Sequence, residues 1–296
     1  MGAALVFPGQ GSQSVGMDAG LDGETFAEAD DALGFALSDI VRDGPEERLA
    51  ETAITQPAIL ATSVAWLRAL RRARPDLTIV GAAGHSLGEI SALVAADSLG
   101  LADALRLVRL RGEAMQAAVP LGVGTMAAVM GLDDAQVEAL CAEAGQGELV
   151  AVAATNCPGQ VSVAGHVGAV DRLIARAEAA GGAAKRLAVS APFHCALLAP
   201  AGERLREALA TIDLRPPSFP VVHNADAGIA ADVAAIRAAL VAQVTLPVRW
   251  SACFARLRVL GATEAIEVGP GKTLAGLGKR IDRALPVRHA RDRMTA

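Results

Sequence analysis

One serine lies between two glycines at a point where a nucleophile could be held. The stretch GHSLGE (residues 84–89) follows an apolar run and precedes a helix-like one. Gly-x-Ser-x-Gly at a strand-to-helix junction is the nucleophile-elbow pattern, in which a strained turn presents the serine at a helix N-terminus. Backbone N–H groups there favour the oxyanion that forms when a hydroxyl attacks a carbonyl. The pattern also fits a serine that only caps the helix, so Ser86 has two interpretations at this point.

A serine nucleophile requires a base, and the chain has five histidines to supply it. His194, in VSAPFHCALL, lies where a central segment (residues 124–188) returns to the remainder of the chain, and a crevice between two such parts is where a substrate is expected. His223 ends an expected strand and is the second candidate. The other three are less suitable. His85 is next to the serine, His166 follows a strand of the central segment, and His289 is in a charged tail expected at the surface. Position therefore favours His194 as the base.

Arg111 is a charged residue on the apolar face of an expected helix over residues 101–119. At 100° per residue, Arg106 and Arg109 fall on the opposite, polar face. A guanidinium taken from water requires an anion, because an unpaired buried charge is costly. That anion is either an internal aspartate or glutamate, or a substrate carboxylate held by two N–H groups.

These residues must be positioned by short apolar runs that alternate with alanine-rich helical patterns, an order typical of an α/β protein with a mostly parallel sheet. The central segment breaks the alternation, because it follows the strand-helix-strand-strand-helix-strand order of a ferredoxin-like unit. The sequence therefore predicts a hydrolase-like large α/β subdomain, residues 1–123 and 189–296, and an inserted ferredoxin-like small subdomain, residues 124–188.

Composition excludes several classes of function. The chain has 296 residues, 52% of them hydrophobic, and a net charge of -5, so it can bury a large core but lacks the basic field that attracts nucleic acid. No apolar run reaches the length of a membrane span, and the stretch MGAALVF has no basic n-region and ends its apolar run at Pro8, which indicates a cytoplasmic protein. The cysteines show neither pairing nor metal-ligand spacing and are expected to be reduced and packed: Cys141, Cys157, Cys195 and Cys253.

Seven blocks along the chain together resemble the malonyl-CoA:acyl carrier protein transacylase family, in the order found in that family. They are FPGQGSQ (residues 7–13), GHSLGE (84–89), RGEAMQ (111–116), NCPGQVSVAG (156–165), APFH (191–194), PVRW (247–250) and EVGPGKTL (267–274). The resemblance runs nearly from end to end, and seven ordered matches arise by chance far less often than one Gly-x-Ser-x-Gly.

The resemblance implies that a malonyl group moves from malonyl-CoA to a serine and then to the phosphopantetheine thiol of an acyl carrier protein. It assigns Ser86 as the nucleophile, His194 as general base and then acid, and Arg111 as the clamp for the malonyl carboxylate. Kinetics are expected to be ping-pong. Neither a permanently bound cofactor nor a metal is implied.

Main-chain groups complete the implied site. The backbone N–H groups of Gln10 and Leu87 correspond to the oxyanion hole, and the main-chain carbonyl of Gln243 corresponds to the group that orients the histidine. The family therefore needs no triad acid, and Asp171, on an expected helix of the small subdomain, is expected to be solvated.

Two further residues are candidates for substrate binding. Phe193 precedes His194 and is of the bulky type that would crowd an α-methyl branch, which favours malonyl over methylmalonyl; a core side chain at the subdomain junction is the alternative. Asn156, which opens the fourth block, is the other candidate.

An acidic carrier protein would need local basic contacts, because this chain is itself net negative. Two basic pairs, near the end of the small subdomain and near the C-terminus, are candidates for that contact, with ordinary surface charge as the alternative: Lys185, Arg186, Lys279 and Arg280.

Three functions remain open in the sequence. A transacylase that supplies fatty acid synthesis is favoured, and a freestanding acyltransferase of a polyketide synthase would share every residue named above. A serine esterase is disfavoured by Arg111, by the missing triad acid and by the lack of an HGGG-type loop.

Overall fold

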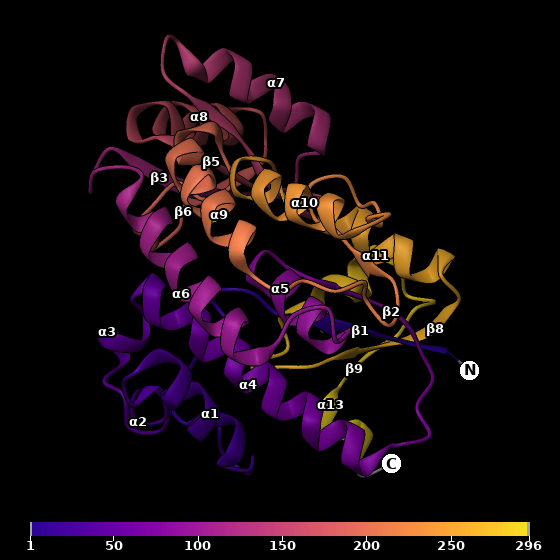
Figure 1. Ribbon diagram of the computed structural model, residues 1–296. Helices are drawn as coiled ribbons and strands as arrows, with labels where there is room; N and C mark the ends of the chain where they lie inside the picture. Colours follow the sequence, from indigo (N-terminus) through magenta and orange to yellow (C-terminus); the bar gives the residue numbers. More distant parts are fainter. Residues whose placement is uncertain (1, 295–296) are drawn as a thin grey trace.

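A five-stranded parallel sheet forms the centre of the large subdomain in the computed structural model, which describes residues 2–294 (Figure 1). The strand order is β7-β2-β1-β8-β9. The bounds are β1 (Gly2–Phe7), β2 (Ile79–Gly84), β7 (Val221–Val222), β8 (Ala262–Glu267) and β9 (Val287–His289). Residues 3–7 of β1 are all buried, as expected for a parallel strand that is covered on both faces.

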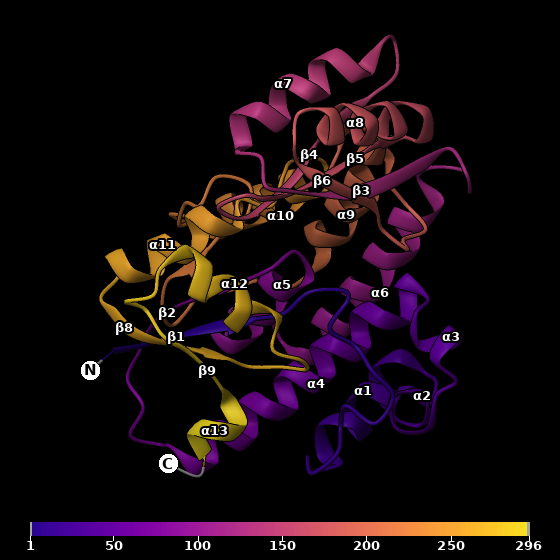
Figure 2. The same ribbon diagram turned by 180° about the vertical axis from the view of Figure 1, so that it is seen from behind.

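Alternate residues of β1 face two different hydrophobic clusters. Leu5 and Phe7 belong to the larger cluster, formed with helices on one side of the sheet, and Val6 belongs to a second cluster, formed with α11 and α12 on the other side (Figure 2). The helices of this subdomain are α1 (Glu24–Leu33), α2 (Leu37–Asp43), α3 (Glu46–Leu49), α4 (Thr52–Ala73), α5 (Leu87–Ala95), α6 (Leu101–Ala117), α9 (Ala199–Thr211), α10 (Val233–Thr245), α11 (Trp250–Val259), α12 (Thr273–Ile281) and α13 (Ala290–Met294), with a 3-10 turn η1 (Ala196–Leu198). Within residues 2–294, none of the helices combines the length and the apolar character that crossing a membrane requires.

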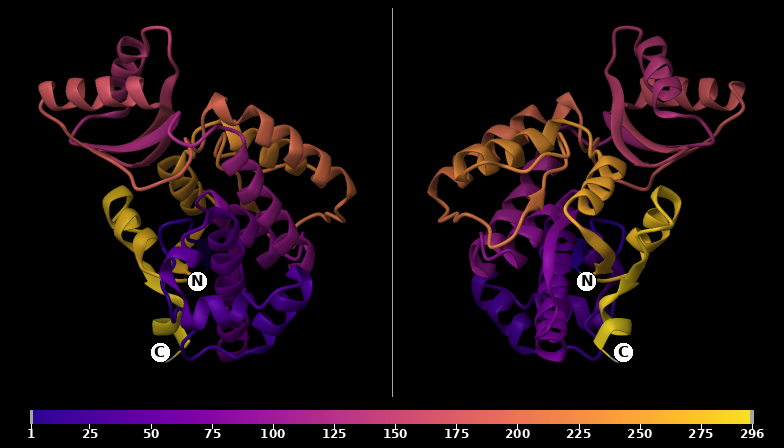
Figure 3. Two further views of the ribbon diagram at one scale, coloured as in Figure 1. Left: turned by 90° about the vertical axis from the view of Figure 1, so that its left-hand side faces the viewer. Right: turned by 90° about the vertical axis from the view of Figure 1, so that its right-hand side faces the viewer.

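The small subdomain has its own four-stranded antiparallel sheet, of order β4-β5-β3-β6. Its elements are β3 (Gly124–Met130), α7 (Asp134–Gly145), β4 (Val150–Cys157), β5 (Gln160–His166), α8 (Val167–Ala179) and β6 (Ala183–Arg186). Figure 3 shows this unit projecting from the remainder of the chain. The two predicted sheets, one mostly parallel and one of ferredoxin-like order, are confirmed; the subdomain boundaries at residues 123/124 and 188/189 stay a prediction.

A short main-chain contact joins the small sheet to the segment between α10 and α11. Val248, between α10 and α11, lies beside the end of β4: its N–H donates to Ala153 O at 2.9 Å, and its carbonyl accepts from Thr155 N at 3.0 Å. The small sheet is therefore fastened to the connection that follows the helix carrying Gln243.

Candidate active site

The elbow around Ser86 is a close approach of three backbone segments. Ser86 lies between β2 and α5 with φ 52° and ψ −109°, a conformation that costs energy for any residue with a side chain. A Cβ atom on Gly84 would lie 1.8 Å from the carbonyl carbon of Gly88, and one on Gly88 would lie 2.1 Å from Phe7 O. Both glycines are therefore required by the turn that exposes the serine.

The Ser86 hydroxyl contacts a histidine and does not cap the helix. Its Oγ lies 2.7 Å from Nε2 of His194, and the Ser86 side chain makes no hydrogen bond to the first turn of α5. On the other side of the ring, Nδ1 of His194 lies 2.8 Å from the main-chain oxygen of Gln243. Because a carbonyl only accepts, Nδ1 carries the proton and Nε2 is left as the acceptor for the serine O–H. The helix-cap interpretation is thus wrong, and the geometry favours His194 over His223.

The surroundings of His194 keep it neutral. Burial lowers the pKa of His194 to about 3, and the nearby positive charge of Arg111 acts in the same direction, whereas the bond to Gln243 opposes them. The imidazole therefore has its basic nitrogen free at neutral pH. His194 itself has φ 60°, so both members of the pair occupy the left-handed region.

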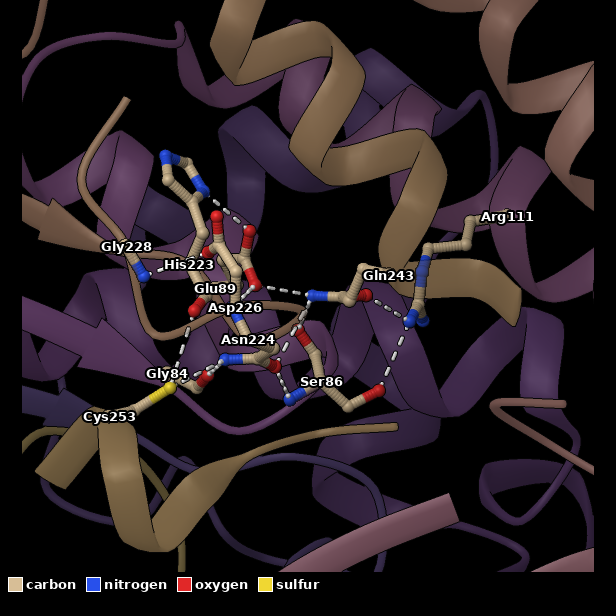
Figure 4. Close-up of polar contacts among 10 residues, drawn as sticks. All are labelled: Gly84, Ser86, Glu89, Arg111, His223, Asn224, Asp226, Gly228, Gln243 and Cys253. Carbon is tan, nitrogen blue, oxygen red and sulfur yellow. Dashed lines mark hydrogen bonds and ion pairs between the residues drawn. The ribbon is translucent and has the colours of Figure 1, made fainter. Parts of the chain in front are cut away.

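Arg111 is buried, with 3% of its surface exposed, and its three partners are uncharged oxygens. Nη2 donates to Oε1 of Gln243 at 2.8 Å and to Ser86 Oγ at 3.1 Å (Figure 4). Nη1 donates to Oε1 of Gln56 at 2.9 Å. Burial lowers the pKa of Arg111 to about 10, and the charge of Glu89 opposes this shift. The internal ion pair considered above is therefore not formed with any described carboxylate, and the guanidinium beside the nucleophile has no anionic partner.

A pocket of about 400 Å³ opens over these groups. Its size suits a small acyl group and part of its carrier arm. Both subdomains line it, through Gln10, Gly11, Gln13, Ala50, Gln56, His85, Ser86, Arg111, Met115, Met126, Ala154, Asn156, Ser162, Leu187, Ala188, Val189, Phe193 and His194.

Asn156 reaches the pocket from the end of β4 and links the small sheet to the elbow. Its Oδ1 lies 2.8 Å from Nε2 of His85, and its Nδ2 donates to Ser162 Oγ at 3.2 Å. Burial lowers the pKa of His85, so this ring is neutral and donates from Nε2. His85 thus points away from the Ser86 hydroxyl, as expected, yet it lines the pocket, which sequence reasoning missed, as it missed Gln56.

Phe193 and the two backbone donors are placed near the same pocket. Phe193 lines it and also belongs to the large hydrophobic cluster, so both interpretations of this side chain are compatible with its position. Gln10 lines the pocket from the loop after β1, and Leu87 is the first residue of α5. Neither backbone N–H donates to any atom of the part of the chain described. Both donors are thus available to an oxyanion.

The remaining histidines have other partners. Nδ1 of His223 lies 2.8 Å from Oε1 of Glu89, and both side chains are buried. The prediction that His289 lies at the surface is wrong: it is buried, donates from Nε2 to Gly269 O at 2.8 Å and packs against the edge of Trp66. The reason is long-range, because β9 pairs with β8 and brings the charged tail into the sheet.

The four basic candidates for carrier contact are exposed and lie on β6 and on the last turn of α12. Arg186 forms an ion pair with Asp171, whose side chain is half exposed. Arg280 bridges to the β4–β5 turn, donating to Gln160 Oε1 at 2.7 Å and to Pro158 O at 3.0 Å. These contacts leave the role of the four side chains a prediction.

The cysteines are buried free thiols, as expected. Beside His194, burial raises the pKa of the Cys195 thiol to about 11, so it is unreactive at neutral pH. Among the described residues no group of three or more histidine, cysteine, aspartate or glutamate side chains is arranged to hold a metal ion.

Comparison with known proteins agrees with this geometry. The model of the acyl transferase domain family matches residues 4–280. The chain is 48% identical over 287 residues to the malonyl CoA-acyl carrier protein transacylase of Salmonella typhimurium, which covers 94% of this chain and 92% of that protein.

Solved structures are equally similar. The acyl-carrier-protein S-malonyltransferase of Burkholderia pseudomallei superposes with a TM-score of 0.96 at 45% identity over 100% of both chains. A malonyl-transacylase solved in complex with a type II PKS acyl-carrier protein gives a TM-score of 0.95 at 45% identity, covering 98% of this chain and 96% of that one. The chain belongs to the malonyl-CoA:acyl carrier protein transacylase family.

Proposed function

We propose that this enzyme transfers the malonyl group of malonyl-CoA to the phosphopantetheine thiol of an acyl carrier protein through a malonyl ester of Ser86. The observation that carries the proposal is the buried Arg111 guanidinium, 3.1 Å from Ser86 Oγ and bonded only to neutral oxygens. An acyl group that ends in a carboxylate supplies the missing anion at the right place. The names of the similar transacylases support the same substrate pair.

The first half-reaction begins at the 2.7 Å contact between Ser86 Oγ and His194 Nε2. Nε2 accepts the hydroxyl proton as Oγ bonds to the thioester carbonyl carbon. The resulting oxyanion accepts hydrogen bonds from the N–H groups of Gln10 and Leu87, and one such donor contributes about 10²–10³ in rate. When the C–S bond breaks, the imidazolium returns its proton to the coenzyme A sulfur, leaving the ester on Ser86 and a neutral His194.

The second half-reaction repeats the steps with the carrier-protein thiol as the nucleophile. Nε2 of His194 accepts the thiol proton, sulfur attacks the ester carbonyl, and the C–O bond to Ser86 breaks as Oγ takes back the proton. Free coenzyme A leaves before the carrier protein reacts, so the kinetics are ping-pong. Every proton moves through one imidazole, and these steps draw on no resident cofactor; malonyl-CoA enters as a substrate.

Selectivity is assigned to three side chains at the pocket. Arg111 pairs with the malonyl carboxylate, and its charged hydrogen bonds contribute about 1.5–3 kcal/mol. Phe193 crowds the position of an α-methyl branch. Asn156, held by His85 and Ser162, presents its amide to the acyl group or the pantetheine arm.

For the pathway, we propose fatty acid synthesis in the cytoplasm, in keeping with the four free thiols. The similarity to a malonyl-transacylase solved with a type II PKS acyl-carrier protein favours polyketide synthesis as the second candidate. The basic pairs on β6 and α12 are proposed to attract the acidic carrier protein in either case: Lys185, Arg186, Lys279 and Arg280.

Intact mass spectrometry tests the proposal. Wild type and Ser86→Ala are mixed with malonyl-CoA alone, and an acyl carrier protein is added afterwards. We expect a malonyl adduct on wild type only, which then moves to the carrier protein. Free malonate without an adduct would instead indicate a hydrolase, and an adduct on Ser86→Ala would remove Ser86 from the mechanism.

A further inference from the structure

One carboxylate, outside the mechanism described so far, is buried directly beneath the elbow. Glu89 is fully buried and lies on the first turn of α5, three residues after the nucleophile. Oε1 lies 2.8 Å from Nδ1 of His223; Oε2 accepts from the backbone N–H of Asn224 at 2.8 Å and from Nε2 of Gln243 at 2.7 Å (Figure 4). The carboxylate therefore connects α5, the segment after β7 and α10.

The connection through Asn224 reaches the nucleophile. Oδ1 of Asn224 accepts from the backbone N–H of Ser86 at 2.7 Å, and its Nδ2 donates to Gly84 O at 2.8 Å. Both contacts are made to the strained turn, whose φ of 52° at Ser86 must be maintained by surrounding bonds. Glu89 fixes Asn224 by accepting its main-chain N–H.

The connection through Gln243 reaches the base and the carboxylate clamp. Nε2 of Gln243 donates to Glu89 and, at 3.0 Å, to the main-chain oxygen of Ser86. These two acceptors fix the orientation of the amide, so that Oε1 is turned towards Arg111, which donates to it at 2.8 Å. A reversed amide would place N–H groups against the guanidinium. The main-chain oxygen of the same residue orients His194.

His223 balances the buried negative charge. Burial acts to lower the pKa of His223, but the hydrogen bond and charge of Glu89 outweigh it and raise the pKa above its usual value. The pair is enclosed, with 3% of the His223 side chain and none of the Glu89 side chain exposed. Its charges are satisfied internally, and neither side chain lines the pocket.

From these contacts we infer that Glu89 is a positioning residue, which aligns the Ser86 turn, the His194 base and the Arg111 clamp together through Asn224 and Gln243. This inference rests on the proposed transfer reaction and deepens it. The function lies in the acceptor oxygen Oε2, since that atom receives both N–H groups that lead to the site. A glutamine can present an oxygen at the same place and turn its NH₂ towards a neutral His223, whereas a leucine leaves both donors without a partner.

The test compares Glu89→Leu and Glu89→Gln with the same two substitutions at Glu267. Glu267 is equally buried and accepts two backbone N–H groups, from Leu274 and Ala275, outside the pocket. Three quantities are measured in each folded variant: the rate of malonyl-serine formation, the preference for malonyl over acetyl, and the rate at which a fluorophosphonate labels Ser86. The last does not involve malonyl, so it separates failure of this inference from failure of the proposed function.

We expect Glu89→Leu to slow both malonyl-serine formation and labelling by about tenfold to a hundredfold and to lower the malonyl preference, because misplaced reacting groups cost that much. Glu89→Gln should restore all three to within about threefold of wild type. Both Glu267 variants should lower the melting temperature and leave the three quantities unchanged. If Glu89→Leu melts lower but reacts like wild type, or if Glu89→Gln loses as much as Glu89→Leu, the inference is overturned.

Asn224→Ala provides a second test of the positioning role, which can be used if Glu89→Leu does not fold. It removes the acceptor for Ser86 N–H and a longer contact of 3.4 Å from Gln243 Nε2, but leaves the stronger bonds of Gln243, to Glu89 and from Arg111. Labelling of Ser86 should therefore slow by about tenfold while the malonyl preference is retained. Unchanged labelling, or a tenfold loss of the malonyl preference as well, would contradict the inference that Asn224 and Gln243 connect Glu89 to the site separately.

Discussion

Two buried histidines, one bonded to Gln243 and the other to Glu89, have surroundings with opposite electrostatic effects. His194 bonds to a neutral carbonyl near a positive guanidinium, and burial with that charge lowers its pKa to about 3. His223 is also buried, but the carboxylate of Glu89 overcomes the effect of burial and raises its pKa. The charge of the partner, rather than burial, thus separates a base with a free nitrogen from half of an internal ion pair.

Arg111 and Glu89, two buried charged side chains, also differ in the charge of their partners. Glu89 has a charged partner inside the protein, whereas Arg111 has three neutral ones and lies at the pocket. One buried charge is already balanced and serves positioning, and the other is left for the substrate. The predictions that follow are given in order of decreasing effect.

Loss of the neutral imidazole should have the largest effect. His194→Ala is expected to slow malonyl-serine formation by about 10²–10⁴-fold, the usual contribution of general-base catalysis. Rapid-quench intact mass measures the rate. His166→Ala is the control, because the His166 ring lies on the small subdomain and accepts from Leu149 N; a similar loss in that variant would contradict the assignment.

Removal of the unpaired guanidinium should affect selectivity. Arg111→Ala is expected to lower the preference for malonyl over acetyl by about one to two decades, since charged hydrogen bonds of 1.5–3 kcal/mol are lost. Competition between the two acyl-CoA substrates gives the ratio. Arg109→Ala, on the exposed face of the same helix and paired with Glu113, should keep the wild-type ratio. A wild-type ratio in Arg111→Ala would exclude the clamp.

A carboxylate introduced by substitution should give Arg111 an internal partner of opposite charge, as His223 has in Glu89. Gln56→Glu places an anion on Nη1 of Arg111, so malonyl loading should slow by about tenfold while acetyl loading changes little. Gln56→Met is the neutral control for changed packing. Equal slowing of both acyl groups, or of both variants, would show that charge at this position does not matter.

The lowered pKa of His194 predicts an unusual pH dependence. An ordinary histidine with a pKa of 6.5 gains its proton as the pH falls through 6.5, but His194 does so only near 3. Loading should therefore stay constant from neutral pH to about pH 5. Arg111→Ala removes a positive charge and should move the acid limb to higher pH. A wild-type midpoint near 6.5 in the kcat/KM profile would contradict this account.

The same shift has a consequence for stability with a defined sign. Between pH 6.5 and about 3 the unfolded chain binds a proton at residue 194 that the folded chain does not. The free energy of unfolding contributed by this group therefore falls as the pH falls through that range. Denaturant titrations at pH 7 and pH 5 measure the free energy of unfolding at each pH. Its decrease from pH 7 to pH 5 should be larger in wild type than in His194→Gln.

Surface charge should give the smallest effect. Lys279→Glu, on the exposed last turn of α12, is expected to raise the KM for the carrier protein by about two- to fivefold, the range of an exposed pair, with malonyl loading unchanged. Arg204→Glu, an exposed arginine on α9, is the control. An equal rise in both variants would mean that only net charge matters.

Much of the fold and site could be predicted because the signals are local. The face of α6 that carries Arg111 follows from 100° per residue, and the glycines that force the Ser86 turn lie within five residues of each other. The alternation of apolar runs likewise indicated the parallel sheet, and the central segment that breaks this alternation indicated the small one. The position of His194 favoured it as the base, and the family resemblance added Gln243 as its partner, which local patterns alone do not indicate.

The remainder depends on contacts that no local pattern encodes. Glu89 meets His223 only because β7 lies beside β2 in the sheet, and His289 is buried only because β9 pairs with β8. From their sequence neighbours alone, Glu89 and His289 would be expected at the surface. Their burial is decided by the order of the strands, which the sequence does not reveal residue by residue.

The two-sheet construction has a consequence for redesign. Nucleophile, base and clamp all lie outside the small sheet: Ser86 between β2 and α5, His194 just before η1, and Arg111 on α6. Pocket walls such as Met126 and Ser162 belong to the small sheet, whose β4 end contacts Val248. A graft of the small unit from a relative with another acyl preference would exchange those walls and keep the chemistry. Exchange of the small unit would therefore change only the walls that it supplies, Asn156 among them, whereas Arg111 and Phe193 would stay with the reacting groups.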